Sequence, residues 1–501
     1  MTWLYAQTRS GGRRHPGRAA TLLTRLGLAP PPTLVRVVGT NGKGSVTAMI
    51  AHGLSLAGRV TGRFLSPHVE EFRERIAVDG VPIGEAEVIA FVDRARVIGP
   101  FDDDLHPAFF DWVLALALEH FARAGVVTAV LEAGVGGASD ATSAATRAMA
   151  ADVANATAAD AAMATAATVA GAIAAGATAA GATAAISNSA TVATSLGWHG
   201  TVELVVLTNV TPEHLDTLGP TLADAARDKA GAFARGVPAV TGASGEALTV
   251  ARRVAAEVGA PLYLDPHVQG PGTEPHPRPG GEPRPGPAAG PHADRAATAA
   301  IPEMPLDTEA LFALPSSLVT PPAGTRAANA RLAAASLRLL GVSERAVAGA
   351  IDAPPLPGRG ERFQVSGVEV ILDGAHDPAA AAALVSEVPP GYVLLFGALR
   401  RKQATATLRV LERGATAVVL TEAAAGEAPP EAAGHVDSRP VADPDAALAL
   451  ALELAAAGGV SATNASPRTV VIAGSLYLAG RLRPLLRALA TPRPTAQLAG
   501  L

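Results

Sequence analysis

A glycine-rich turn between an apolar run and a helix-like segment sets the first limit on how this chain can fold. The run is LVRVV at 34–38, the turn is GTNGKGS at 39–45, and helical character continues from Ser45 to Leu56. In a strand–turn–helix unit of this kind the glycines let backbone N–H groups face phosphate oxygens, and the lysine adds positive charge. The sequence therefore predicts an α/β fold with an anion-binding loop in its first fifty residues.

The turn is a variant of the strict P-loop pattern. Val37 occupies the position of the first glycine, and Gly44 separates Lys43 from Ser45. Strand, lysine and hydroxyl are nevertheless all in place, which favours a nucleotide loop over an ordinary glycine-rich turn. Ser45 is expected to reach a magnesium ion held by the phosphates. The predicted nucleotide-binding residues of the loop are Gly39, Thr40, Asn41, Gly42, Lys43, Gly44 and Ser45.

Later apolar runs also end in polar or glycine residues. Such runs are typical of buried parallel strands, and in parallel α/β sheets ligands bind in the crevice beyond the carboxyl ends of the strands. We predict an α/β chain with an N-terminal P-loop domain, whose sheet is mostly parallel, and a smaller C-terminal Rossmann-like α/β domain. The runs are 126–131 before Glu132, 204–207 before Thr208, 368–372 before Asp373, 392–396 before Gly397, and 470–473 before Gly474.

Two segments of unusual composition interrupt this pattern. An Ala-rich, low-complexity stretch at about 144–194 predicts an insert, and a Pro- and Gly-rich stretch at about 265–293 predicts an exposed linker. We place the domain boundary at the C-terminal end of the linker, which gives domains at 1–296 and 297–501. A chain of 501 residues has room for both, since a domain takes about 150 residues.

Composition excludes several classes of protein. The net charge of −5 gives no basic field for nucleic acid or an anionic membrane, and the absence of cysteine removes disulfides, thiolate metal sites and cysteine nucleophiles. The stretch from Ala161 to Val202 lacks charged residues, but it consists mainly of Ala, Thr and Gly, which do not favour membrane insertion. Without an apolar run for a signal peptide, we expect a cytoplasmic protein with no membrane or nucleic-acid partner.

The GTNGKGS turn resembles the ATP loop of the Mur ligase superfamily, and in particular that of the folylpolyglutamate synthase/dihydrofolate synthase family. Further segments resemble motifs of that family and occur in its order, from Trp3 to about Arg481. In the first part of the chain they are LSPHV at 65–69, FRERI at 72–76, LEAGVGG at 131–137, DAT at 140–142, TNV at 208–210, HLDTLG at 214–219 and DKAG at 228–231. In the second part they are NA at 329–330, PGR at 357–359, DGAH at 373–376 and GSLYL at 474–478.

The resemblance implies ATP-driven amide formation by a P-loop ATP-binding domain and a C-terminal Mur-type domain. The γ-phosphoryl group of ATP passes to a substrate carboxylate, and the amino group of L-glutamate attacks the resulting acyl phosphate. The implied cofactors are ATP and Mg²⁺, and the implied acceptors are dihydropteroate, reduced folates, or both. Phosphoryl transfer of this kind depends mainly on positioning and on neutralising charge. The family also implies a monomer.

The resemblance assigns metal and catalytic roles to individual residues. Ser66, Glu132 and His214 match magnesium ligands, and Lys229 matches a lysine that is carbamylated in the family and then holds a second magnesium ion. Taken alone, each has a plainer interpretation. Glu132 is then a strand-end residue that caps the next turn, and Lys229 is a solvated helix lysine. His214 then lies in the first turn of a helix whose N-cap is Thr211.

Residues of the second domain complete the implied nucleotide site. Asp373 would accept the ribose hydroxyls of ATP, and Asn329 would contact the nucleotide. The arginine that reaches ATP is either Arg359 or Arg362, because a second arginine follows the PGR turn and precedes FQV. His376 would lie near the transferred phosphate, or else stabilise the DGAH turn. The implied catalytic residues are Lys43, Lys229 and His376. Because ATP lies between the domains, they must close for chemistry.

Departures from the family's motifs gather around its pterin-binding segments. The implied substrate-binding residues are Phe110, Asp111, Asp140, Ala141 and Thr142. Near these segments Asp111 replaces a Glu, Ala138 and Ser139 replace an Arg-Leu pair before DAT, and Ser143 replaces the Asn after it. Elsewhere, Asp377 replaces the Asn of DGAHN, and 401–403 (RKQ) replaces an acidic D-K-D. The nucleotide loop and the implied metal ligands are unchanged, so the departures bear on the acceptor and not on the reaction type. Two other functions stay open: another Mur-type amino-acid ligase, or a non-catalytic nucleotide-binding scaffold.

Overall fold

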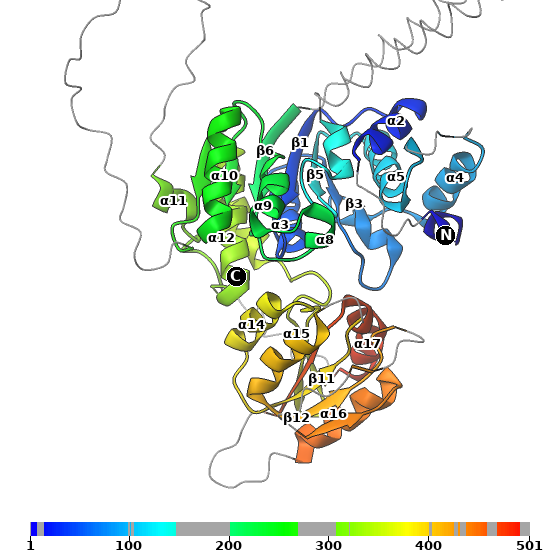
Figure 1. Ribbon diagram of the computed structural model, residues 1–501, viewed down its shortest axis with the longest axis vertical. Helices are drawn as coiled ribbons and strands as arrows, with labels where there is room; N and C mark the ends of the chain where they lie inside the picture. The colour runs from blue at the N-terminus through cyan, green and yellow to red at the C-terminus, as the bar shows by residue number, and fades with distance from the viewer. Residues whose placement is uncertain are drawn as a thin grey trace, which may run out of the picture.

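In the computed structural model the chain forms two α/β units, drawn one above the other in Figure 1. The structure describes residues 2–7, 15–98, 101, 105–146, 201–268, 307–319, 321–399, 403–424, 429–430, 437–457 and 468–490. Most of the predicted Ala-rich insert and of the predicted linker lies outside the described residues, as do Arg401 and Lys402. Within the described part, no helix is both long and apolar enough to cross a bilayer.

The first sheet is built around β1 (Thr33–Val38), the strand that leads into the glycine-rich turn. Its other strands are β2 (Thr61–Phe64), β3 (Ile76–Val78), β4 (Val81–Pro82), β5 (Thr128–Glu132), β6 (Thr201–Leu207), β7 (Ala239–Thr241) and β8 (Leu262–Leu264). They are arranged in the order β4-β3-β2-β5-β1-β6-β7-β8. β1 pairs in parallel with both neighbours, and β3 and β4 form an antiparallel edge.

Helices cover both faces of the first sheet, because alternate residues of each strand point to opposite sides. Val35 and Val37 are buried in a cluster with α3 (Lys43–Leu56), whereas Leu34 is buried in a cluster with α5 (Phe109–Arg123). The α5 face also carries α1 (Thr2–Ala6), α2 (Gly17–Arg25), α4 (Glu85–Ala95), α9 (Leu222–Ala230) and α10 (Gly245–Val258). Shorter helical segments are η1 (Phe72–Arg75), η3 (Ala141–Ala145) and α8 (Leu215–Leu218).

The helices that follow the linker pack on the first sheet. These are α11 (Thr308–Phe312), α12 (Gly324–Leu339) and α13 (Glu344–Asp352), and their buried residues share one core cluster with α3. The close approach depends on Gly53 of α3, where a Cβ would lie 2.5 Å from Leu337 and 3.2 Å from Ala350. The predicted boundary at 296/297 assigns these helices to the second domain, but their apolar faces form part of the core of the first.

The second sheet carries the C-terminal part of the chain. Its strands are β9 (Glu361–Val365), β10 (Val368–Leu372), β11 (Tyr392–Phe396), β12 (Ala415–Leu420), β13 (Ser438–Pro440) and β14 (Thr469–Ala473), in the order β13-β12-β11-β14-β10-β9. β9 is antiparallel to β10, and the other pairs are parallel.

Helices cover both faces of the second sheet as well. One face packs against α14 (Pro378–Glu387) and α15 (Ala404–Leu411), and the other against α16 (Pro444–Ala457) and α17 (Leu476–Leu489). A short segment, η4 (Glu412–Gly414), follows α15. The predicted fold class, two α/β domains with mostly parallel sheets, is confirmed.

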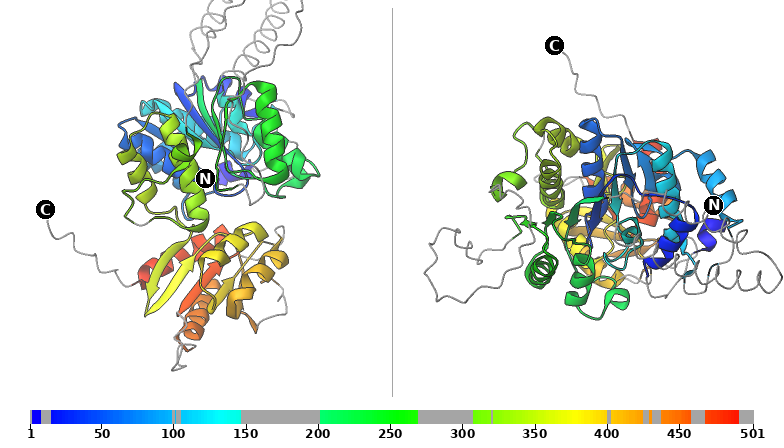
Figure 2. Two further views of the ribbon diagram at one scale, coloured as in Figure 1. Left: turned by 90° about the vertical axis from the view of Figure 1, so that its left-hand side faces the viewer. Right: turned by 90° about the horizontal axis from the view of Figure 1, so that it is seen from above.

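Strand ends of both sheets face the region where the two units meet, which the side view also shows (Figure 2). β1 leads into the glycine-rich turn and β5 ends at Glu132, while β10 and β14 are followed by Asp373 and Gly474. All of these strand ends contribute to the wall of one cavity. The topology therefore brings together the polar strand ends that the sequence predicts as a ligand site.

Candidate functional site

A cavity of about 750 Å³ lies where the strand ends of the two sheets meet. Of the residues predicted as functional from the sequence, it is lined by Thr40, Asn41, Gly42, Lys43, Gly44, Ser45, Ser66, Glu132, His214, Asn329, Arg359, Asp373 and His376. Lys229 contacts the glycine-rich turn through a hydrogen bond to the carbonyl of Gly39. The fold thus collects the predicted nucleotide and metal residues from distant parts of the chain.

The glycine-rich turn requires glycine at two positions. Gly42 has a φ of +81° and is the N-cap of α3, and a Cβ there would lie 2.3 Å from Oδ1 of Asn329. Gly39 has a φ of +139°, and a Cβ there would lie 2.0 Å from Oγ1 of Thr208. Gly42 to Ser45 line the cavity, so the N-terminus of this 14-residue helix is accessible from it, where backbone N–H groups and the helix dipole favour an anion.

Two lysine amino groups donate hydrogen bonds to backbone carbonyls of the turn. Nζ of Lys43 donates to the carbonyl of Thr40 at 2.8 Å, and Nζ of Lys229, which is 1% exposed, donates to the carbonyl of Gly39 at 3.0 Å. Burial lowers the pKa of both lysines. The positive charge of Lys43 lowers the pKa of Lys229 further, to about 7. Lys229 is therefore a lysine whose amine is neutral in a large fraction of molecules at neutral pH.

Glu132 is a buried carboxylate at the end of β5. Its side chain accepts the N–H of Ser66 at 2.8 Å, and Oε2 would lie 3.4 Å from a Cβ at Gly44, so it is aimed at the first turn of α3. Burial raises its pKa, an effect that the nearby positive charge of Lys43 opposes. A carboxylate in such a place is costly unless a cation compensates it. The geometry fits a hard divalent ion, for which carboxylate and hydroxyl oxygens are suitable ligands.

Glu213 is a candidate that the sequence analysis missed. Its Oε1 lies 3.3 Å from Nε2 of His376 and 3.7 Å from Nε2 of His214. Its position in TPEHLD, directly beside the predicted ligand His214, is the signal that would have found it. His214 has a φ of +59° and is the N-cap of α8. It therefore lies before the first turn of that helix and not within it.

In the second domain, Asp373 holds the backbone of two neighbouring turns. Its Oδ2 accepts the N–H of Gly360 at 2.7 Å and its Oδ1 accepts the N–H of Ala375 at 2.8 Å. Burial raises its pKa, and the charge of Arg359 opposes that rise. Arg359 lines the cavity, whereas the side chain of Arg362 lies on β9 and donates to Glu369. The structure therefore separates the two arginines that the sequence left as alternatives.

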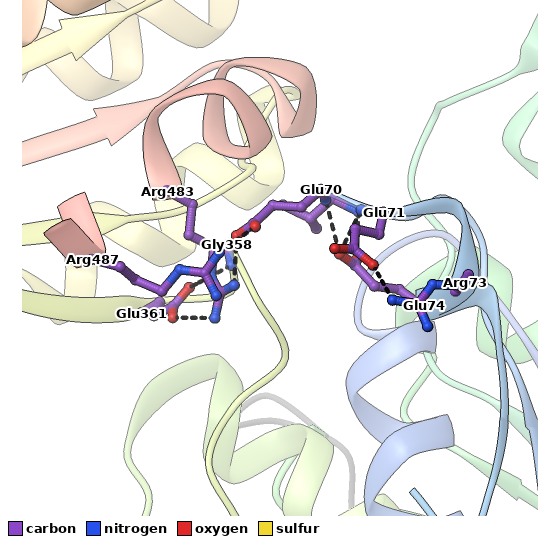
Figure 3. Close-up of polar contacts among 9 residues, drawn as sticks. Glu70, Glu71, Arg73, Glu74, Gly358, Glu361, Arg483 and Arg487 are labelled. Atoms are coloured by element: carbon purple, nitrogen blue, oxygen red, sulfur yellow. Dashed lines mark hydrogen bonds and ion pairs between the residues drawn. The ribbon is translucent and has the colours of Figure 1, made fainter. Parts of the chain in front are cut away.

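An ion cluster joins the two domains beside the cavity (Figure 3). Nη1 of Arg483, on α17, donates to Glu70 at 2.6 Å. Its Nε and Nη2 donate to the two carboxylate oxygens of Glu361 at 2.7 and 2.8 Å. Glu361 in turn accepts the N–H of Gly358, directly before Arg359. The segment that follows Ser66 is thus linked by charge to the turn that carries Arg359.

The predicted acceptor-binding residues are not among the described residues that line the cavity. Asp111 accepts the N–H of Ala108 at 2.7 Å and so caps α5, and Asp140 accepts the N–H and hydroxyl of Thr142 at 2.9 and 2.6 Å. Ala141 is buried in the hydrophobic cluster that also contains residues of α5. Phe110 packs against Phe64, and one edge of its ring approaches Gly134, which does line the cavity.

Residues 358–476, from the turn before β9 to the start of α17, match the family model described as Mur ligase, glutamate ligase domain. The second domain is therefore similar to a Mur ligase domain. The matched range begins beside Arg359 and includes Asp373 and His376, so this domain provides the second-domain wall of the cavity.

Curated relatives match most of the chain. A probable bifunctional folylpolyglutamate synthase/dihydropteroate synthase of Haloferax volcanii is 29% identical over 472 residues, which cover 90% of this chain and 46% of the relative. The dihydrofolate synthase/folylpolyglutamate synthase of Escherichia coli is 29% identical over 430 residues, which cover 81% of this chain and 80% of the relative. The chain spans about half the length of the haloarchaeal relatives it matches.

Solved structures share the fold over nearly the whole chain. The Mycobacterium tuberculosis folylpolyglutamate synthase complexed with ADP has a TM-score of 0.68 at 22% identity, with 98% of each chain covered. The family-model match and the named homologues confirm the resemblance that the sequence motifs indicate, and the solved structure confirms the fold.

Proposed function

We propose that the protein is an ATP-dependent ligase that adds L-glutamate to dihydropteroate, to the γ-carboxyl group of reduced folates, or to both. The reaction passes through an acyl phosphate and releases ADP and phosphate. The observation that carries the proposal is the cavity, which collects a P-loop lysine, a buried strand-end carboxylate and strand-end residues of a Mur ligase domain. The name folylpolyglutamate synthase, which both matched relatives carry, describes the same chemistry, and this supports the assignment.

In this proposal both domains hold ATP. The turn at 39–45 binds the phosphates through backbone N–H groups and through Lys43, at the N-terminus of α3. Asp373 accepts the ribose hydroxyls, and Asn329 and Arg359 contact the nucleotide from the wall of the cavity. Because Asn329 belongs to α12, its contact comes from the helices that pack on the first sheet.

Ser66, Glu132 and His214 fit a magnesium ion, since they offer a hydroxyl, a buried carboxylate and an imidazole to the same cavity. When bound, magnesium would neutralise charge on the phosphates. Two side chains act on the transferred group in this proposal. Lys43 offsets the charge that develops on it, and His376 lies beside it at the edge of the second domain.

We also propose that Lys229 is carbamylated, as the resemblance implies. Its neutral amine would attack carbon dioxide, forming an N–C bond and releasing a proton, so that an anion able to hold a second magnesium ion replaces a cation. The pKa of about 7 supports this step, because only the neutral amine is nucleophilic. Electron density beyond Nζ tests it directly, and Lys229→Ala should lose most of the activity.

The acceptor is proposed to lie beside Phe110, where the aromatic ring approaches the wall of the cavity at Gly134. Asp111 and the segment Asp140, Ala141 and Thr142 would shape that edge through the turns they cap. Replacing Phe110 by alanine should raise the KM for the acceptor and leave the affinity for ATP unchanged. A proportional loss of ATP affinity would argue for a general structural role instead.

The organisation of the whole protein is proposed on the same basis. We take the first domain to extend to about residue 353, because α11 to α13 pack in its core, and the Mur ligase domain to follow it. The resemblance supports a monomer in the cytoplasm. Light scattering of the purified chain tests the oligomeric state.

The deciding experiment is ATP-dependent phosphate release with Mg²⁺ and L-glutamate, with dihydropteroate compared with tetrahydrofolate. Release with both acceptors supports a bifunctional synthase. Release with tetrahydrofolate alone supports a polyglutamylase whose pterin-binding segment is altered near Ala138 and Ser139. Release with neither, in a protein that binds ATP, would refute the folate assignment in favour of another Mur-type ligase. Phosphate release that never depends on glutamate would favour a non-catalytic scaffold.

A further inference from the structure

Three side chains of types that ligate metals lie together where the two domains meet: Glu213 and His376 line the cavity, and Asp377 lies beside them. Glu213 belongs to the loop after β6, and His376 and Asp377 follow β10. Their ligand atoms all lie within 4.8 Å of one another, and Oε1 of Glu213 is 3.3 Å from Nε2 of His376. Neighbouring ligands around one small cation are separated by about 3 Å when the bonds to it are near 2.1 Å. The spacing therefore suits one ion.

The hydrogen bond at Nδ1 of His376 determines the role of Nε2, the ring nitrogen that faces Glu213. Nδ1 lies 2.9 Å from the carbonyl oxygen of Gly374, and a carbonyl only accepts, so Nδ1 carries a proton. In the neutral ring Nε2 then presents a lone pair to the carboxylate of Glu213. Two acceptors at this distance need a proton or a cation between them. A backbone carbonyl on the far nitrogen is also the arrangement that orients histidine toward metals.

Asp377 supplies an independent observation. It is 7% exposed, and its Oδ1 accepts the N–H groups of Ala379 and Ala380 at 2.9 Å each, which caps α14. Its Oδ2 is buried and has no hydrogen-bond partner among the described residues. A buried carboxylate oxygen without a donor is costly unless a cation compensates it. Asparagine stands here in the family motif, so the carboxylate is a departure of this chain.

We propose that Glu213, His376 and Asp377 form a binding site for a divalent transition-metal ion that joins the two domains. An imidazole with two carboxylates suits Zn²⁺ or Mn²⁺ better than Mg²⁺, for which an imidazole is a less usual ligand than oxygen. The site uses neither Ser66 nor Glu132, and it needs no nucleotide. Since one ligand comes from the first domain and two from the second, the ion stabilises the arrangement of the domains in this structure.

The test is zinc binding to the tag-free, full-length protein without nucleotide, measured by competition with a chelating dye. We expect the wild type to bind Zn²⁺ at this site and Asp377→Asn to bind it at least about tenfold more weakly. The variant keeps its fold, because asparagine caps helices as well as aspartate does and retains Oδ1. Glu132→Gln is the matched control, since it removes a proposed magnesium ligand and should leave the zinc affinity unchanged.

A second readout is the melting temperature, which Zn²⁺ should raise in the wild type and in Glu132→Gln but not in Asp377→Asn. Equal zinc affinity in the wild type and Asp377→Asn would overturn the proposal. So would a wild type that binds no zinc, or loss of zinc binding in Glu132→Gln alone. None of these results depends on which acid the ligase uses, so this site and the proposed function fail or stand separately.

Discussion

Replacing Lys229 by methionine should remove a pH-dependent part of the protein's stability. Lys229 is 1% exposed on α9 and donates to the carbonyl of Gly39, and its pKa is lowered from 10.5 to about 7. Each pKa unit is worth about 1.36 kcal/mol, so keeping this amine protonated in the folded state costs roughly 5 kcal/mol. Methionine fills a similar volume without a charge to bury.

The sign follows from proton binding. Between pH 7 and 10.5 the unfolded chain holds the Lys229 proton and the folded chain has mostly released it. The unfolded state thus binds more protons, and the free energy of unfolding rises with pH across that window. Integrated from pH 7 to pH 9, the gain is about 2 kcal/mol. Below the folded pKa both states are protonated, and the whole penalty is present.

The assay is urea unfolding at pH 7, 8 and 9 in carbon dioxide-free buffer with chelator, so that neither carbamate nor metal intervenes. Tryptophan fluorescence reports the relevant domain, because Trp3 and Trp112 pack edge to face in its core. The wild type should gain about 2 kcal/mol over this range relative to Lys229→Met. Lys43 also faces Lys229, but it is present in both proteins. Equal pH slopes for the two proteins would refute the reasoning.

Three further changes test the site. Gly42→Ala should weaken binding of a non-hydrolysable ATP analogue at least about tenfold, because the left-handed backbone costs about 1–2 kcal/mol and the Cβ would meet Asn329; an unchanged Kd would contradict this. Glu132→Gln should cut Mg²⁺-dependent phosphate release by about 100-fold or more, while the Tm stays the same or rises because a buried charge is removed. A lower Tm would show that Glu132 stabilises the fold instead. Glu70→Gln removes the negative charge that faces Arg483 and Arg487, and it should raise the KM for ATP several-fold at low salt. The effect should shrink at high salt if it is electrostatic.

Polar residues at strand ends were predictable because their position follows from local pattern and topology alone. Glu132 and Asp373 each end a buried apolar run, and parallel pairing gathers such ends at one edge of a sheet. The glycine-rich turn was predictable for the same reason, since strand, lysine and helix are contiguous in the chain. These features depend on no contact between distant helices.

Contacts between distant segments were not predictable in the same way. The linker composition marks where regular structure stops, but it does not tell on which sheet the next helices pack. Their place depends on the fit of Leu337 and Ala350 against Gly53. The choice between Arg359 and Arg362 likewise depends on the β9–β10 hairpin, which directs the second arginine to Glu369.

Hydrogen-bond satisfaction separates structural from functional acids in this chain. Asp140 is fully buried, but it accepts two hydrogen bonds from Thr142 and one from the N–H of Val135, so the surrounding turn compensates its charge.

Among the described residues Glu132 accepts one hydrogen bond, from Ser66, and burial raises its pKa. A carboxylate has room for about four donors, so Glu132 retains capacity that a ligand in the cavity can fill. Asp140 has much less to offer a substrate. The motif DAT therefore identifies a turn that shapes the site, and the strand-end glutamate identifies the place where a cation and phosphates are expected to meet.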